Sequence, residues 1–148
     1  MKKRLFTILL SIIMITTSVY PALAANGSEI SPQASLYLSS YSVDLIALGN
    51  GRMAIEMDIN ATGYMTELGV QELYIEKKVN GVWVEYDTVY GAYHSDFYVY
   101  NDYTYLGEYI FNGTSGVQYR VTMTAYARNS SGSDIGFAYT SAVTCHNP

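Results

Sequence analysis

The residues Met-Ala-Ile-Glu-Met-Asp-Ile-Asn at positions 53–60 decide the fold class of this chain. Their apolar side chains alternate with polar or small ones, which is the period of a β-strand that has one face in the core and the other in water. Met53, Ile55, Met57 and Ile59 are therefore predicted to point inward. No helical period follows residue 25, so the sequence predicts an all-β protein.

Alternating segments and turns follow one another along the rest of the chain. Gly49-Asn50-Gly51 is a predicted turn, and Asn80-Gly81 predicts a tight hairpin because both residues accept a positive φ. The segment 60–69 is predicted to be a loop, since Gly63 and Gly69 interrupt it. The predicted strands cover residues 36–45, 53–60, 73–79, 82–89, 104–111, 117–126 and 135–143, and residues 97–100 could add a short one.

The side-chain pattern also predicts local details of two strands. In the first strand the apolar positions change parity across Ser39-Ser40, which indicates a β-bulge there. In the last strand Ile135, Phe137 and Tyr139 form the large apolar set, and we expect this set to face the core. Seven strands joined by short turns predict an antiparallel β-sandwich at residues 35–148, with a β-barrel as the alternative.

The first 25 residues read as a helical signal peptide. Lys2, Lys3 and Arg4 are followed by an apolar stretch, by Pro21, and by Ala22-Leu23-Ala24, the small-x-small pattern that a signal peptidase requires. An uncleaved anchor is the alternative, but the apolar stretch 5–20 is shorter than the ~20 residues that span a bilayer. We expect cleavage after residue 24 or 25, a polar lead-in at 26–34, and a secreted, extracellular protein.

Composition and charge exclude several classes of protein. About half of the residues are apolar and 14% are charged, which excludes disorder. Without the three basic residues of the leader, five basic residues remain against 13 acidic ones, a formal charge of −8. Such a surface repels phosphate, so we expect no nucleic-acid partner, and a membrane contact only through the leader before cleavage.

The segment from Gly113 to Thr144 resembles the end of a fibronectin type III or related immunoglobulin-like module. The resemblance rests on the Gly113-Thr114 turn, the run from Tyr119 to Ala125, and the spacing of the following turn and strand. It implies a seven-stranded immunoglobulin-like sandwich. It also implies that Tyr119 is the tyrosine-corner residue, whose hydroxyl bonds back to the preceding turn.

A second resemblance covers the chain after the leader as well as the leader itself. The sequence is similar to a set of small exported proteins of Gram-positive bacteria that carry a domain of unknown function. This resemblance implies the fold and the location, and it implies no activity. The segments that carry it are Met65-Thr66-Glu67-Leu68-Gly69-Val70, Ile75-Glu76-Lys77-Lys78, Asn80-Gly81-Val82-Trp83 and residues 113–127.

The sequence contains no motif for catalysis, so we predict that the protein is not an enzyme. His94 and His146 are the only histidines, and neither lies in a nucleophile or metal motif. Cys145 is the only cysteine, so it could pair only between chains, or it has no structural role. In an extended chain Cys145 and His146 point to opposite faces, which disfavours a thiolate–imidazole pair. We predict no catalytic residue, no metal and no cofactor.

The densest unusual feature is a run of seven tyrosines between positions 90 and 109. Exposed tyrosines offer a rigid apolar ring with a polar tip, which suits the recognition of sugars and proteins, but tyrosine is also a common strand former. With Phe97 and Val99 facing the core, Tyr98 and Tyr100 would point outward. The sequence therefore predicts extracellular binding of a glycan or protein ligand, with a carbohydrate-binding module or a self-associating surface protein as alternatives. The predicted contact residues are Tyr90, Tyr93, Tyr98, Tyr100, Tyr103, Tyr105 and Trp83, and Tyr109 completes the run.

Overall fold

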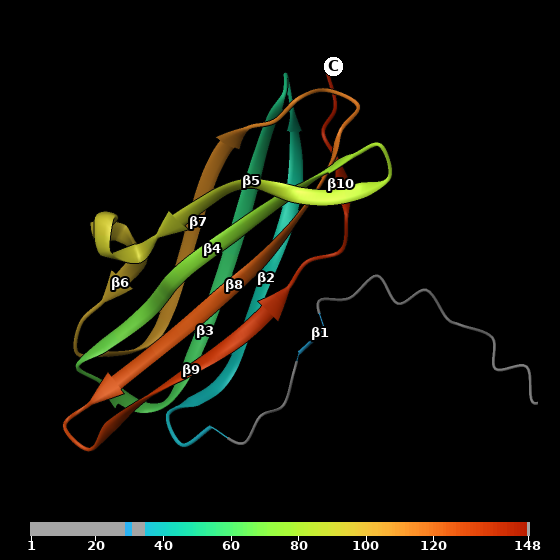
Figure 1. Ribbon diagram of the computed structural model, residues 1–148. Coiled ribbons are helices and arrows are strands. Elements are labelled where there is room, and N and C mark those ends of the chain that lie inside the picture. The colour runs from blue at the N-terminus through green and yellow to red at the C-terminus, as the bar shows by residue number, and fades with distance from the viewer. Residues whose placement is uncertain (1–28, 31–34, 148) are drawn as a thin grey trace, which may run out of the picture.

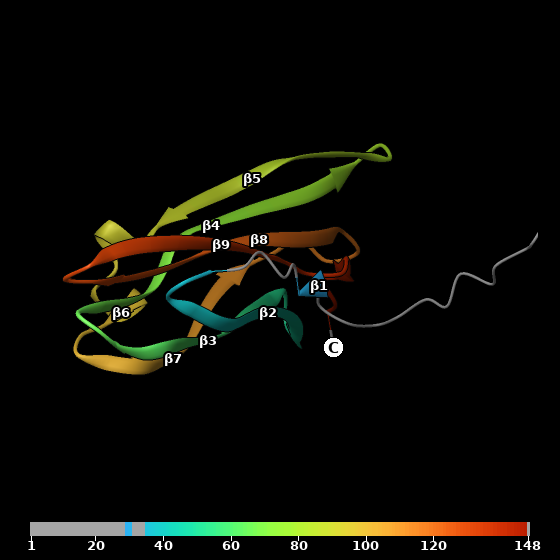
Figure 2. The ribbon, with the colours of Figure 1, turned by 90° about the horizontal axis from the view of Figure 1, so that it is seen from below.

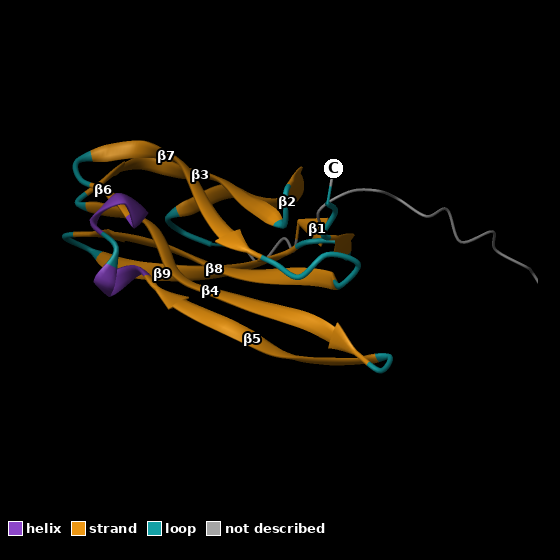
Figure 3. Cartoon of the chain, turned by 90° about the horizontal axis from the view of Figure 1, so that it is seen from above, coloured by secondary structure: helices purple, strands orange, loops and turns teal. Residues whose placement is uncertain are grey.

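The computed structural model describes residues 29–30 and 35–147, which form two antiparallel β-sheets packed face to face (Figures 1, 2 and 3). The strands are β1 (Glu29–Ile30), β2 (Leu38–Gly49), β3 (Arg52–Met65), β4 (Glu67–Val79), β5 (Val82–Tyr90), β6 (Tyr98–Val99), β7 (Asp102–Asn112), β8 (Gln118–Asn129), β9 (Gly132–Tyr139) and β10 (Val143–Thr144). Two short 3₁₀ turns, η1 (Gly91–Tyr93) and η2 (Ser95–Phe97), follow β5. The predicted leader lies outside the described residues, as does most of the polar lead-in.

The strand order within the described residues is that of an immunoglobulin-like sandwich. One sheet has the order β1-β9-β8-β4-β5, with β6 added to β4 and β10 added to β8, and the other has the order β2-β3-β7. Strand β5 pairs with β4 and not with β7, which lies in the other sheet, as in a fibronectin type III-like domain. The predicted all-β sandwich is confirmed: seven long strands, β2–β5 and β7–β9, build it, and three strands of two residues each, β1, β6 and β10, are added to it in the described residues.

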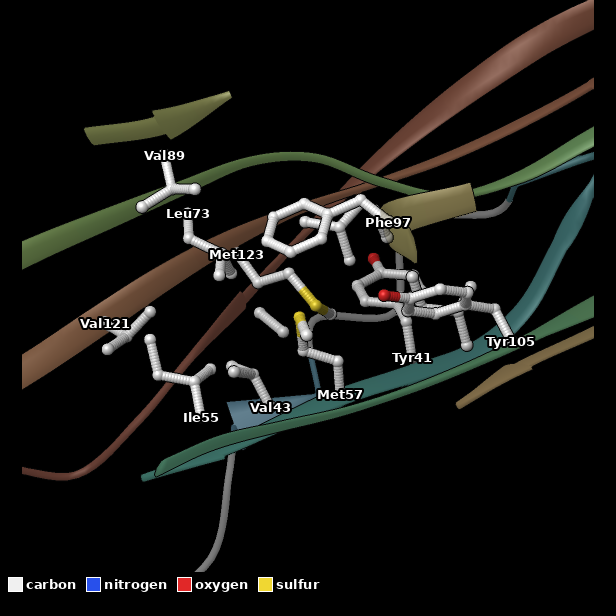
Figure 4. Close-up of a cluster of buried hydrophobic side chains, with 14 of the residues drawn as sticks. Tyr41, Val43, Ile55, Met57, Leu73, Val89, Phe97, Tyr105, Val121 and Met123 are labelled. Carbon is white, nitrogen blue, oxygen red and sulfur yellow. The ribbon is translucent and has the colours of Figure 1, made fainter. Parts of the chain in front are cut away.

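The core lies between the two sheets, and β3 contributes to it the apolar side chains that were predicted to point inward. Met53, Ile55, Met57 and Ile59 are all at most 3% exposed. The facing sheet contributes buried side chains from β4 and β8, and Figure 4 shows Met57 and Met123 pointing toward each other across the interface. The alternation of residues 53–60 is therefore confirmed as the pattern of a half-buried strand, except that Ala54, predicted to face water, is also buried.

The predicted turns and the bulge are also confirmed. Asn50 and Asn80 adopt left-handed φ values of 53° and 51°, each followed by a glycine that also has a positive φ. The pairing of β2 with β3 shifts its register between Leu38 and Ser40, where the parity change indicated a bulge. Local turn chemistry was therefore readable from the sequence.

The prediction that Phe137 faces the core is wrong. Phe137 is 40% exposed, and its neighbours Ile135 and Tyr139 are exposed as well, whereas Gly136 and Ala138 point inward. The ring of Tyr41 occupies the space beneath β9, so that a Cβ added at Gly136 would lie 2.5 Å from the Cζ of Tyr41. Only the small residues of β9 fit against this ring.

Two predicted strand boundaries are also wrong. Residues 60–69 are not a loop, because β3 continues to Met65 and β4 begins at Glu67. The extension is held by the N-terminal part of the domain, where the backbone N–H of Thr62 donates to the carbonyl of Tyr37. The last strand ends at residue 139 and not at 143, because Thr140 exchanges two hydrogen bonds with the backbone of Val121, one of them through its hydroxyl.

Candidate functional site

Four tyrosines of the predicted run are exposed at one end of the sandwich. Tyr90, Tyr93, Tyr100 and Tyr103 are 49%, 85%, 63% and 51% exposed, and they lie at the ends of β5 and β7 or in the segment between these strands. This segment contains both 3₁₀ turns and lies at the left of Figure 1. We call this end of the molecule the tyrosine end.

Tyr105 does not belong to this exposed set, so its prediction as a contact residue is wrong. Its side chain is 1% exposed and lies beside Tyr41 in the core (Figure 4). Its hydroxyl donates to the carbonyl of Asp96 over 3.2 Å, and burial raises the pKa of Tyr105 to about 12. Tyr103 and Tyr105 alternate across β7, so one ring is in water and the other is in the core.

A cluster of rings anchors the segment between β5 and β7. Phe97 is fully buried, as predicted, and the His94 ring stacks on it with a centroid distance of 4.9 Å. Tyr109 contacts both rings edge-on and is half-buried, so it packs against the core. Tyr98 was predicted to point outward but is half-buried, because its ring packs edge-on against Tyr126 of β8.

Two glycines allow this segment to lie directly on β4. A Cβ added at Gly69 would collide with the carbonyl oxygen of Phe97, and one at Gly91 would collide with the carbonyl oxygen of Val70. The same added atom at Gly91 would lie 2.9 Å from the hydroxyl of Tyr98. The backbone of this segment therefore approaches that of β4 more closely than any residue other than glycine would permit at positions 69 and 91.

A groove of about 490 Å³ opens between the segment and the start of β4. We call it the tyrosine groove. Its one lining carboxylate, Glu67, forms an ion pair with Arg128 across 2.9 Å and is largely buried. The lining residues are Glu67, Gly91, Ala92, Tyr93, His94, Ser95, Tyr98 and Tyr100.

Trp83 lies far from the tyrosine groove. It is seven residues from Tyr90 along β5, a separation of roughly 23 Å in an extended strand. Its ring packs under the guanidinium of Arg120 at 4.5 Å and near the ammonium of Lys78 at 5.5 Å. Arg120 in turn makes two hydrogen bonds to Glu76, which raise the pKa of Arg120. The structure therefore does not bring Trp83 together with the predicted tyrosines.

Tyr119 makes the contact that the resemblance implied. Its hydroxyl accepts a hydrogen bond from the backbone N–H of Thr114 over 2.8 Å, and its ring is fully buried. Cys145 is buried near Gly113, whereas His146 is exposed. The two side chains thus point to different environments, as expected for neighbours in an extended chain.

Sequence reasoning missed one exposed ring of the tyrosine end. Tyr64, at the end of β3, is 73% exposed and packs edge-on against Tyr103 at 5.3 Å. It fell in the segment 60–69 that was predicted to be a loop, and so it was not assigned to a face. Continuing the alternation of β3 through Gly63 would have placed Tyr64 on the outward face, opposite to Ile59.

A second hollow lies on the outer face of β2-β3-β7 and is acidic. It has a volume of about 540 Å³, and Asp44, Glu56 and Glu108 stand side by side in register across the three strands. No predicted contact residue lines it. Within the residues that the structure describes, no three His, Cys, Asp or Glu side chains are placed to hold a metal ion.

No protein-family model, no curated protein sequence and no solved structure matches this chain. The resemblance to small exported bacterial proteins remains a prediction. Among the residues that the structure describes, no helix is long and apolar enough to cross a membrane.

Proposed function

We propose that the protein is exported and acts outside the cell as a non-catalytic binding protein, with the tyrosine end as its contact surface. One observation carries the proposal: several tyrosine rings are exposed together at one end of the sandwich, and the ring partners of Tyr93 and Tyr103 are themselves exposed tyrosines. Tyr93 and Tyr100 are the most exposed of the predicted contact residues, and each projects from the segment that Phe97 anchors. Export is supported by the charged, apolar and small-residue pattern of positions 1–25.

The chemistry of these rings suits recognition. A tyrosine side chain has few rotatable bonds, so it loses little conformational entropy when a ligand immobilises it. It presents an apolar face and a hydroxyl that donates and accepts hydrogen bonds. Exposed rings held by a rigid sheet and a close-packed segment are also largely preorganised, which lowers the cost of binding.

The proposal is tested with the protein purified after export and probed against arrays of glycans and extracellular proteins. The triple variant Tyr93→Ser/Tyr100→Ser/Tyr103→Ser is expected to lose the binding that the wild type shows. Tyr139→Ser is the matched control, because Tyr139 is 47% exposed but lies on β9. Equal binding by the wild type and the triple variant would contradict the proposal. Self-association that the triple variant abolishes would identify a second copy as the partner.

A further inference from the structure

We infer that the tyrosine groove binds a neutral oligosaccharide. This inference rests on the proposed function and names the class of ligand that the contact surface recognises. The exposed residues Tyr93 and Tyr100 line the groove, as does Gly91, whose backbone lies against that of Val70 in β4. A volume of about 490 Å³ falls within the range of sites that hold small ligands, roughly 300–1,000 Å³.

The groove offers rings and polar tips but no aliphatic pocket. Its lining contains three tyrosines, a histidine, a serine and a glutamate, and its largest aliphatic side chain is that of Ala92. A pyranose ring has an apolar face of C–H groups and an equatorial rim of hydroxyls. The apolar face packs on the tyrosine rings, and the sugar hydroxyls form hydrogen bonds with hydroxyl, imidazole and carboxylate groups of the lining.

The pairing of β4 beside the groove disfavours an extended peptide. Peptides that bind to sheets add a strand to an edge with free backbone groups. At Gly69, however, β4 is paired on both sides, with Tyr98 of β6 and with Tyr126 of β8. A peptide therefore cannot add a strand to β4 at this point, and the lining offers rings and polar groups without an aliphatic pocket for an apolar peptide side chain.

The local charge disfavours an anionic ligand. Glu67 is the carboxylate of the lining, and Asp96 lies one residue beyond the lining residue Ser95. The nearby guanidinium of Arg128 is already paired with Glu67. With an overall excess of acidic residues as well, the groove repels uronic acids and phosphorylated glycans, which leaves neutral sugars.

The largely buried carboxylate of Glu67 has a defined role in this site. Its pairing with Arg128 fixes the side chain, and a carboxylate oxygen can accept hydrogen bonds from two adjacent sugar hydroxyls. Glu67→Gln removes the charge and keeps the shape, whereas Arg128→Ala removes the ion pair and keeps the carboxylate. The first variant should therefore weaken sugar binding more than the second.

The test is affinity electrophoresis of the exported protein in native gels that contain soluble β-glucan, mannan or starch, with polygalacturonate as the anionic counterpart. We expect retardation by at least one neutral polysaccharide and none by polygalacturonate. Tyr93→Ala and Tyr100→Ala should each lower the affinity by about tenfold or more, as loss of a stacked ring predicts. Tyr100→Phe should keep most of the affinity, and Tyr139→Ala, on β9 and outside the tyrosine end, should keep all of it.

The outcomes separate this inference from the proposed function. No retardation by any neutral polysaccharide, together with tyrosine-dependent binding to a protein on the arrays, would overturn the inference and leave the function standing. Retardation that Tyr93→Ala and Tyr100→Ala leave unchanged would overturn the groove as the site. Absence of tyrosine-dependent binding in both the gels and the arrays would overturn the inference and the proposed function.

Discussion

At the tip of the β4–β5 hairpin, the ring of Trp83 lies beneath Arg120 and beside Lys78, whereas at the other end of β5 the ring of Tyr93 is 85% exposed. Tyr86, in the middle of β5, also has partners within the fold. Its hydroxyl donates to the carbonyl of Asn112 over 2.6 Å, and its ring packs edge-on against Tyr119. The same residue types thus stabilise the fold at one end and remain available to a ligand at the other.

This difference shows that the number of aromatic residues in a segment does not by itself indicate a binding surface. What separates the two ends is whether each ring has a partner that the fold supplies. On the β4–β5 hairpin, the ring of Trp83 packs against the guanidinium of Arg120, and the hydroxyl of Tyr86 donates to the carbonyl of Asn112. At the tyrosine end, the partners of Tyr93 and Tyr103 are other exposed tyrosines. An exposed pair of rings leaves most of its surface open to a third group.

The largest expected effect comes from two neighbouring positions on β7. Tyr105→Ala should lower the free energy of unfolding by about 3–5 kcal/mol, because it leaves a cavity in the core. Tyr103→Ala should lower it by less than about 1 kcal/mol, because this ring is half exposed. Urea denaturation of both variants measures the difference. Similar losses for the two variants would show that Tyr103 is a structural residue, and the distinction between the ends would fail.

The second expected effect compares the ion pairs at the two ends. Arg120→Ala should cost about 1 kcal/mol, since it removes two hydrogen bonds to Glu76 and the contact with Trp83. Arg128→Ala should cost less than about 0.5 kcal/mol, because the Arg128 side chain is 55% exposed and makes a single contact with Glu67. The unfolding midpoints in urea check both values. A larger loss for Arg128 would mean that the tyrosine end depends on its charges.

The smallest expected effect concerns a carboxylate that attaches the start of the domain to β9. Asp134 accepts hydrogen bonds from the hydroxyl of Ser35 and from the backbone N–H groups of Tyr37 and Leu36, and these bonds lower its pKa. A lowered pKa in the folded state stabilises the protein above the pKa of the unfolded chain. This contribution is lost as the pH falls below the ordinary aspartate value of 3.8 and through the lower pKa of the folded state.

The Asp134→Asn variant tests this contribution. Its unfolding midpoint should change less than that of the wild type over the same pH range, since the titrating group is gone. Urea denaturation at several pH values measures the change. An identical acid response in the wild type and the variant would show that other carboxylates cause it.

Much of the fold could be predicted because its signals are local. The alternation of residues 53–60 and the left-handed turns at Asn50 and Asn80 depend on neighbouring residues alone. The errors arose where a distant residue decides. The inward face of β9 is set by the ring of Tyr41, nearly a hundred residues earlier, so the larger side chain of Phe137 points outward.

The candidate site could be predicted only in part for the same reason. The density of tyrosines drew attention to the segment after β5, where Tyr93 and Tyr100 are exposed, and the inward position of Phe97 was confirmed. Tyr105 is buried because of the way in which β7 packs over the core. Trp83 lies far from the exposed tyrosines because β5 is nine residues long. The groove itself depends on a close approach of two backbones at Gly69 and Gly91, which no local pattern indicates.

The free energy of unfolding of the triple variant Tyr93→Ser/Tyr100→Ser/Tyr103→Ser tests most directly whether the exposed rings are dispensable for folding. We expect a value within about 1.5 kcal/mol of the wild type, because each ring is exposed and has at most an exposed ring as its partner. A loss of about 3 kcal/mol or more, the size expected for buried rings, would show that these tyrosines hold the fold together and would contradict the account.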